Sequence, residues 1–172
     1  AQRYRSVDAI IRDLDHFARQ EPLEARADTV DPERIAYCPP GAPAWPARTS
    51  PAADGYLLFF STLEPRKNVG GLLDAYERLL ANETGAIAAE GAAQSTRCRV
   101  PDLVLAGRAT EDARPWLDRI ARPPLVGRVR HIGYVQPERR QALYAGARLL
   151  VQPSFDEGFG MPVLEAMTVG VP

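Results

Sequence analysis

The stretch SFDEGFGMPVLEAM, residues 154–167, decides how this chain is interpreted. The stretch follows the apolar run 149–151 and contains two glycines. A helix is predicted after them, because Pro162 is typical of a first helical turn and Gly170 of the residue just past a helix end. An apolar strand, a glycine-containing loop and a helix together predict a β-α unit. Because a helix start presents free N–H groups and a positive potential, the loop at Gly158 and Gly160 is a candidate anion site.

The same alternation of strand and helix patterns extends toward the N-terminus. We predict strands at 56–61, 103–106, 129–135 and 149–151, and helices at about 72–80, 112–121, from Pro137 onward, and about 161–169. Repeated β-α units predict an α/β fold, a Rossmann-like doubly wound parallel sheet with helices on both faces. In the common order the first strand lies beside the fourth, and ligands bind at their carboxyl ends.

The loop after the first predicted strand contains adjacent cations, Arg66 and Lys67, at the point where a helix begins. Arginine offers a planar fork to phosphate oxygens, and lysine offers a compact point charge. A solvated turn is the alternative interpretation of this pair. Its position at the predicted crevice favours an anion site.

Two acidic residues accompany the second loop: Glu157 before the last helix and Glu165 in its first turn or so. A carboxylate accepts two hydroxyl hydrogen bonds at once, which suits the vicinal diols of a sugar or a ribose. Gly158 and Gly160 allow the backbone to approach a ligand closely. A capping or helix-dipole role is the alternative for both glutamates.

The run EGFGMPVLE, residues 157–165, resembles the E-x7-E motif of the glycosyltransferase group 1 family. The preceding ALYAGARLLVQPS, residues 142–154, resembles the usual lead-in to that motif, TLEPRKN at 62–68 resembles the phosphate-binding segment, and residues 131–135 fit the base-binding loop. The resemblance covers about residues 30–172. It implies the GT-B architecture, in which two Rossmann-like domains face each other across a cleft, and it makes this chain the C-terminal, donor-binding half.

The resemblance also implies roles for individual residues. Glu165 would bind the ribose hydroxyls, Glu157 would contact hydroxyls of the transferred sugar, and Arg66 and Lys67 would neutralise the diphosphate leaving group. The catalytic residues expected in this way are Glu157, Lys67 and Arg66. The donor-binding residues are Glu165, Gly158, Phe159, Gly160, Met161, Thr62, Gly133, Tyr134 and Val135. The chain departs from many members at Ser61 and Thr62, where they carry Gly-Arg, so Lys67 is the safer assignment.

The implied reaction is retaining transfer of a sugar from a GDP- or UDP-linked donor to an acceptor hydroxyl, without a cofactor or a metal. Several members with a segment similar to TLEPRKN use nucleotide-mannose donors, which makes mannose a candidate sugar. The acceptor would be a saccharide or a lipid-linked molecule, bound mainly by an N-terminal domain. Alternatives are a non-catalytic nucleotide-sugar-binding module, a GT-B sugar-nucleotide epimerase and a phosphorylase. A dinucleotide-dependent oxidoreductase is disfavoured, because Val163 stands where the glycine motif needs a third small residue.

For the domain organisation we expect an N-terminal helix and linker at 1–50 and a Rossmann-like nucleotide-sugar-binding domain at 51–172. The chain begins without Met and stops just after a helix signal, so we expect a fragment that is truncated at the C-terminus of this domain. In that case the fourth strand would be a bare sheet edge. Residues 81–100 are Ala-, Gly- and Glu-rich without apolar periodicity and are expected to form a flexible insertion.

Composition excludes several function classes. Lys+Arg 21 against Asp+Glu 22 gives no electrostatic case for nucleic acid, and the two cysteines make no disulfide framework. The longest apolar runs are strand-sized, so no transmembrane segment is expected. The default location is cytoplasmic, with the inner face of the membrane as an alternative. Asp13 and Asp15 have metal-site spacing but diverge on a predicted helix, and His16 and His131 are expected to be structural.

Overall fold

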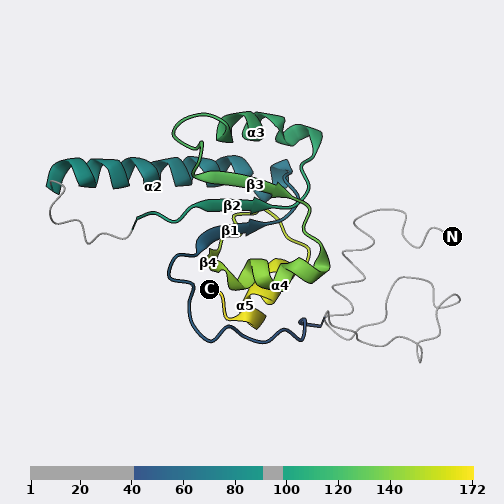
Figure 1. The fold of residues 1–172 in the computed structure, drawn as a ribbon. Helices are drawn as coiled ribbons and strands as arrows, with labels where there is room; N and C mark the ends of the chain where they lie inside the picture. Colours follow the sequence, from purple (N-terminus) through teal and green to yellow (C-terminus); the bar gives the residue numbers. More distant parts are fainter. Residues whose placement is uncertain (1–40, 91–98) are drawn as a thin grey trace, which may run out of the picture. The chain divides into compact units, whose positions relative to one another are not determined.

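The structure, a computed structural model, describes residues 41–90 and 99–172 (Figure 1). The predicted N-terminal helix, with the Asp13–Asp15 pair and His16, lies outside the described residues, as do both cysteines. Residues 41–55 contain no helix or strand, as expected of a linker.

The centre of the fold is a parallel sheet in the order β3-β2-β1-β4. Its strands are β1 (Tyr56–Phe60), β2 (Leu103–Ala106), β3 (Val129–Gly133) and β4 (Ala147–Leu150). The prediction that the first strand lies beside the fourth is therefore confirmed. All of β2 is buried, as is typical of a parallel strand covered on both faces.

Helices cover the two faces of the sheet (Figure 1). They are α2 (Val69–Glu90), α3 (Arg114–Ile120), α4 (Pro137–Ala145) and α5 (Met161–Val169), with short 3₁₀ helices η2 (Pro65–Lys67) and η3 (Glu111–Ala113). Alternate strand residues point to opposite faces. Phe59 and Leu105 consequently join Leu73 of α2 in one core, whereas Leu58 and Val104 pack with α4 and α5 in the other.

The predicted element boundaries needed correction in several places. Residues 81–90 continue α2 and are not a loop, because this stretch is rich in Ala and Glu, which favour helix without any apolar periodicity. The helix predicted at 112–121 is divided into η3 and α3. The third strand ends at Gly133, which adopts φ 69° and leaves the extended conformation, and β4 begins two residues before its predicted start.

The prediction of a bare edge at β4 is wrong in part. The N–H of Leu150 donates to the carbonyl of Pro172 at 2.8 Å, so the last residues lie beside the strand. Val171 is buried in the same core as Leu58. Arg48, in the segment before β1, also bonds to this part of the chain. Its guanidinium donates to the carbonyls of Gly170 and Ala147 at 3.1 and 2.6 Å. The end of the described chain is thus held by both backbone and side-chain hydrogen bonds.

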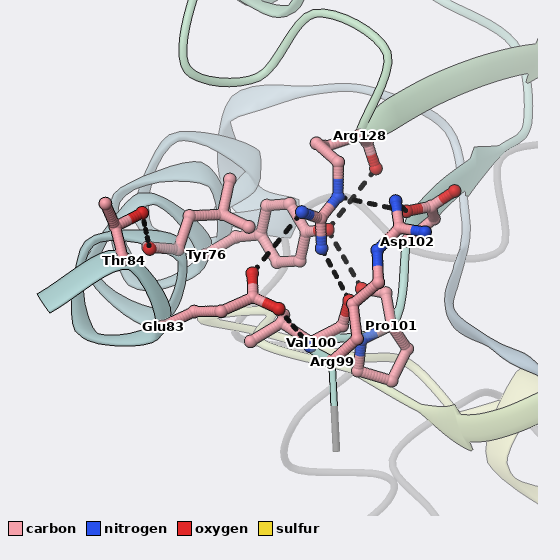
Figure 2. Close-up of polar contacts among 9 residues, drawn as sticks. Tyr76, Glu83, Thr84, Arg99, Val100, Pro101, Asp102 and Arg128 are labelled. Carbon is pink, nitrogen blue, oxygen red and sulfur yellow. Dashed lines mark hydrogen bonds and ion pairs between the residues drawn. The ribbon is translucent and has the colours of Figure 1, made fainter. Parts of the chain in front are cut away.

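At the amino end of the sheet, polar contacts around Arg128 join α2 to the segment before β2 (Figure 2). Its guanidinium lies 3.3 Å from Glu83 Oε2 of α2 and 3.1 Å from Asp102 Oδ1 ahead of β2. Glu83 Oε1 in turn accepts the Val100 N–H at 2.9 Å. Tyr76 donates its hydroxyl to the carbonyl of Pro101 at 2.9 Å, and burial raises the pKa of Tyr76. These bonds fix the start of β2 against α2.

Candidate functional site

The loops after β1 and β4 meet at the carboxyl end of the sheet. The Phe155 N–H donates to the Arg66 carbonyl at 2.9 Å, and the Asn68 side-chain amide donates to the Pro153 carbonyl at 3.1 Å. Asn68 adopts the left-handed conformation, φ 54°, and its N–H caps η2 by bonding to Pro65. The tight turn that results directs Arg66 and Lys67 toward the second loop, as the strand order predicted.

Lys67 forms the central contact between the loops. Its Nζ lies 2.6 Å from Glu157 Oε1, and the residue is only 5% exposed. A lysine is almost never buried without a partner, and here the partner comes from the other loop. Lys67 is also the chain's single lysine among 21 Lys and Arg residues. The one lysine, whose ammonium is a compact and strongly hydrated point charge, therefore lies at a buried position, and the other basic residues of the chain are arginines.

Glu157 is held as an ionised acceptor. The Ser154 hydroxyl donates to Glu157 Oε1 at 2.6 Å, in addition to the Lys67 contact. Burial raises the pKa of Glu157, but the hydrogen bonds from Lys67 and Ser154 and the charge of Lys67 outweigh it, so the pKa lies below its usual value. The carboxylate is thus charged and oriented at neutral pH.

Arg66 occupies a different environment from its neighbour. Its side chain is 52% exposed, and its Nε lies 2.7 Å from Glu64 Oε1. One guanidinium nitrogen also donates to the Asp156 carbonyl at 3.2 Å. An exposed ion pair of this kind contributes little to stability, so the guanidinium can exchange its partners for an anion.

The glycine loop leaves backbone donors free at the start of α5. Gly160 caps the helix at φ 74°, without a side-chain cap, and Pro162 has no N–H to contribute. The N–H groups of Gly158, Phe159, Gly160 and Met161 donate to no described residue. Phe155 and Phe159 are 76% and 60% exposed beside them. The arrangement is an open loop with amides available to an anion.

Glu165 lies apart from the Lys67–Glu157 pair. It is the fifth residue of α5, so it stands in the second turn and not the first, about 6 Å along the axis from Met161 at 1.5 Å per residue. It is buried, and its Oε2 accepts the hydroxyl of Tyr144 at 2.7 Å. Arg140 lies 3.4 Å from Oε1. The structure thus joins Lys67 directly to Glu157 and Arg66 to the neighbouring Asp156 carbonyl, whereas Glu165 faces α4.

The predicted base-binding segment, residues 131–135, comprises the last three residues of β3 and the two residues that follow it. Tyr134 is 48% exposed, and the guanidinium of Arg108 lies 4.9 Å from its ring centroid. Val135 is buried, and Gly133 accepts the Gly107 N–H at 2.8 Å. His131 contacts the Gly107 carbonyl at 2.9 Å through Nε2. The loop therefore lies at the same edge of the sheet as the other two. Thr62 is exposed just beyond β1 at this edge.

Sequence reasoning missed several residues that shape this edge. Ser154 orients Glu157, Asn68 turns η2, and Tyr144 and Arg140 contact Glu165. Gly107 follows β2 at φ 138°, where an added Cβ would lie only 1.9 Å from the Ser61 carbonyl oxygen. A glycine directly after an apolar strand was an available signal for the last of these. The helix–helix contacts had no local signal.

A cavity of about 510 Å³ lies at the opposite, amino end of the strands. Among the residues that line it are Asp54, Tyr56, Pro101, Arg130 and Arg148. It includes none of the predicted site residues, and parallel sheets of this kind bind ligands at the carboxyl end. We therefore place the candidate site at the carboxyl end.

In residues 41–90 and 99–172, no three His, Cys, Asp or Glu side chains are grouped so as to hold a metal ion, and no helix is long and apolar enough to cross a bilayer.

Comparison with known proteins gave relatives over most of the chain. It is 37% identical over 182 residues to the O-antigen chain mannosyltransferase B of Escherichia coli, covering 98% of this chain and 44% of that protein. It is 33% identical over 119 residues to the serotype-specific mannosyltransferase WbdA of Escherichia coli, covering 68% of this chain and 13% of the relative. The chain thus spans less than half the length of these curated relatives.

Two solved structures show the same fold. The crystal structure of TarM matches with a TM-score of 0.57 at 18% identity, over 76% of this chain and 22% of that one. HepE from Anabaena, in complex with UDP and glucose, matches with a TM-score of 0.50 at 22% identity, over 70% of this chain and 29% of that one. Both are GT-B glycosyltransferases, which confirms the predicted fold class. Residues 46–172 match the family described as glycosyl transferases group 1, and the chain belongs to that family.

Proposed function

We propose that this chain binds the nucleotide-sugar donor of a retaining glycosyltransferase, and that the transferred sugar is mannose. The observation that carries the proposal is the Lys67–Glu157 contact at 2.6 Å, which joins the loops after β1 and β4 beside the free amides that open α5. This places positive charge, hydrogen-bond donors and an ionised carboxylate at one edge of the sheet.

The chemistry of sugar transfer explains why these groups belong together. As the bond from the anomeric carbon to phosphate breaks, negative charge builds on the departing diphosphate. Lys67 uses one of its three donors on Glu157 and has others for phosphate oxygens, while the amides of Phe159, Gly160 and Met161 add neutral donors. Preplaced donors stabilise developing charge with little reorganisation. We therefore propose that no metal or cofactor is needed on the diphosphate.

The remainder of the donor fits the same edge of the sheet. Glu165, one turn along α5 from the free amides, would accept the ribose hydroxyls, and the loop at Gly133 to Val135 would line the base. Glu157, whose carboxylate is oriented by Lys67 and Ser154, would accept hydroxyls of the sugar. We assign no residue of this chain as a nucleophile.

The names of the relatives support mannose and a saccharide acceptor. The Escherichia coli proteins are an O-antigen chain mannosyltransferase and a serotype-specific mannosyltransferase. Because this chain spans under half of those relatives, we propose that the acceptor hydroxyl is held mainly by other parts of the polypeptide. We also propose that the protein acts in the cytoplasm, where nucleotide sugars are available. Binding of a nucleotide sugar without transfer is the alternative.

The proposal is tested on the full-length protein with a panel of GDP- and UDP-linked sugars, scoring both transfer and donor hydrolysis. We expect turnover of a mannose donor, and we expect Lys67→Met to reduce it by about 100- to 1,000-fold, since loss of one preplaced donor raises the barrier by about 2.7–4 kcal/mol. Arg66→Met tests the second cation of the pair. It is exposed and already paired with Glu64, so its loss should be below about tenfold.

Two results would contradict the proposal. Turnover that is equal in Lys67→Met and wild type would remove the leaving-group role. Tight binding of the nucleotide sugar with neither transfer nor hydrolysis in any donor of the panel would favour the binding module.

A further inference from the structure

We propose that Tyr144 and Arg140, both on α4, are positioning residues that hold the Glu165 carboxylate so that it reads the two ribose hydroxyls of the donor. The proposal rests on the donor-binding function above and extends it to residues outside the loops that carry the family motifs. Its basis is the contact of α4 with α5, where two different side chains hold the two oxygens of one buried carboxylate.

Tyr144 holds its hydroxyl rigidly. The residue is fully buried, and its ring packs against Phe60 at 5.3 Å and Trp45 at 6.0 Å between centroids. Because the ring cannot turn away, the hydroxyl stays 2.7 Å from Glu165 Oε2. Burial, together with this hydrogen bond, raises the pKa of Tyr144, so the phenol remains a donor throughout the physiological range.

Arg140 approaches the other carboxylate oxygen. One of its terminal nitrogens lies 3.4 Å from Glu165 Oε1, and its guanidinium lies 5.5 Å from the ring centroid of Phe60. A carboxylate that is 9% exposed needs a nearby positive charge, and Arg140 supplies it. The buried Nε of Arg140 has no hydrogen-bond partner among the described residues.

The two contacts differ in strength, and the difference has a consequence for binding. Oε2 is committed to a short bond from a fixed donor, whereas Oε1 is engaged only at 3.4 Å. A ribose diol can therefore bond to Oε1 and, through a second lone pair, to Oε2 without turning the carboxylate. Such a preorganised acceptor binds more tightly than a freely rotating one, because no side-chain entropy is lost.

The experiment compares binding of ligands that have and lack the diol. Titration calorimetry on the full-length protein would use GDP and UDP with their 2′,3′-dideoxy counterparts. For wild type we expect a preference of at least about tenfold for the ribose form of the nucleotide that binds. Tyr144→Phe should reduce that preference about fivefold or more while leaving the dideoxy affinity within about twofold. A loss of general stability would change both affinities together.

Tyr76→Phe is the matched control. It removes a hydroxyl from another buried tyrosine that donates to a backbone carbonyl at the amino end of the sheet. It should keep the full ribose preference. Arg140→Gln is the second variant, should Tyr144→Phe fail to fold, and it should reduce the ribose preference in the same direction.

The outcomes separate this proposal from the proposed function. If Glu165→Gln removes the ribose preference while Tyr144→Phe and Arg140→Gln retain it, the positioning role is wrong and the donor site stands. If wild type binds the ribose and dideoxy forms equally, the ribose role of Glu165 is wrong, and the positioning role is wrong with it.

Discussion

The amino and carboxyl ends of the sheet differ in how their polar groups are paired. At the amino end, Arg128 bonds two carboxylates and a backbone carbonyl, and the Tyr76 hydroxyl bonds another carbonyl, so these donors all have partners within the fold (Figure 2). At the carboxyl end, a run of amides at the start of α5 has no partner among the described residues, and Phe159 is exposed. The first arrangement stabilises the fold. The second arrangement leaves backbone N–H groups available to bind a ligand.

The largest expected effect is a loss of stability, and it tests whether the carboxyl end of the sheet requires a glycine directly after β2. Gly107→Ala would place Cβ 1.9 Å from the Ser61 carbonyl oxygen at φ 138°, so steric overlap and strain act together. We expect the free energy of unfolding to fall by about 2–6 kcal/mol, the sum of typical overpacking and strain effects. The urea midpoint of the full-length protein measures it.

Gly158→Ala is the matched control for that substitution. No atom lies within 4 Å of its added Cβ, and its φ is not in the left-handed region. We expect a stability change within about 0.5 kcal/mol. Equal losses in the two variants would show that Gly107 has no special role in bringing β2 close to Ser61.

A smaller effect tests whether the Arg128 contacts at the amino end of the sheet stabilise the fold without contributing to nucleotide binding. Arg128→Met would leave Glu83 and Asp102 without their shared cation and the Val100 carbonyl without a donor. Hydrogen bonds to charged groups contribute about 1.5–3 kcal/mol, and partial exposure lowers this, so we expect a loss of about 1–2 kcal/mol. Nucleotide affinity should be unchanged, as measured by calorimetry.

Arg119→Met is the control for charge removal as such. Among the described residues, the Arg119 guanidinium bonds the side chains of Asp74 and Glu77, and the Arg119 side chain is 32% exposed. Its loss should be below about 1 kcal/mol. A weakened nucleotide affinity in Arg128→Met, but not in Arg119→Met, would contradict the separation between the two ends.

The sequence predicted the parts of the fold that follow from local pattern and from topology. The apolar runs around Leu58 and Val104 are strand-sized, and Pro162 with Gly170 marks both ends of α5. The strand order predicted that the loops carrying Lys67 and Glu157 lie together, because neighbouring parallel strands end at the same edge of the sheet.

The remaining features depend on how distant elements meet. Tyr144 reaches Glu165 because of the rotation of α4 against α5, which no local pattern specifies. Gly107 is required because of the approach of Ser61 from another strand. Glu157 was predicted as a sugar ligand, but its orientation by Ser154 and Lys67 became visible only in three dimensions.

The smallest effect concerns the charge state of Glu157. Because the folded-state pKa of Glu157 lies below its ordinary value of 4.5, the carboxylate contributes stability that is fully present above pH 4.5 and is lost as pH falls through the folded value. Its side chain is 27% exposed, so we expect less than about 1 kcal/mol. Urea unfolding of wild type and Glu157→Gln at pH 7 and pH 3 should show wild type more stable at pH 7 and the gap reduced at pH 3. A gap of the same size at both pH values would mean that the ion pair with Lys67 does not stabilise the fold.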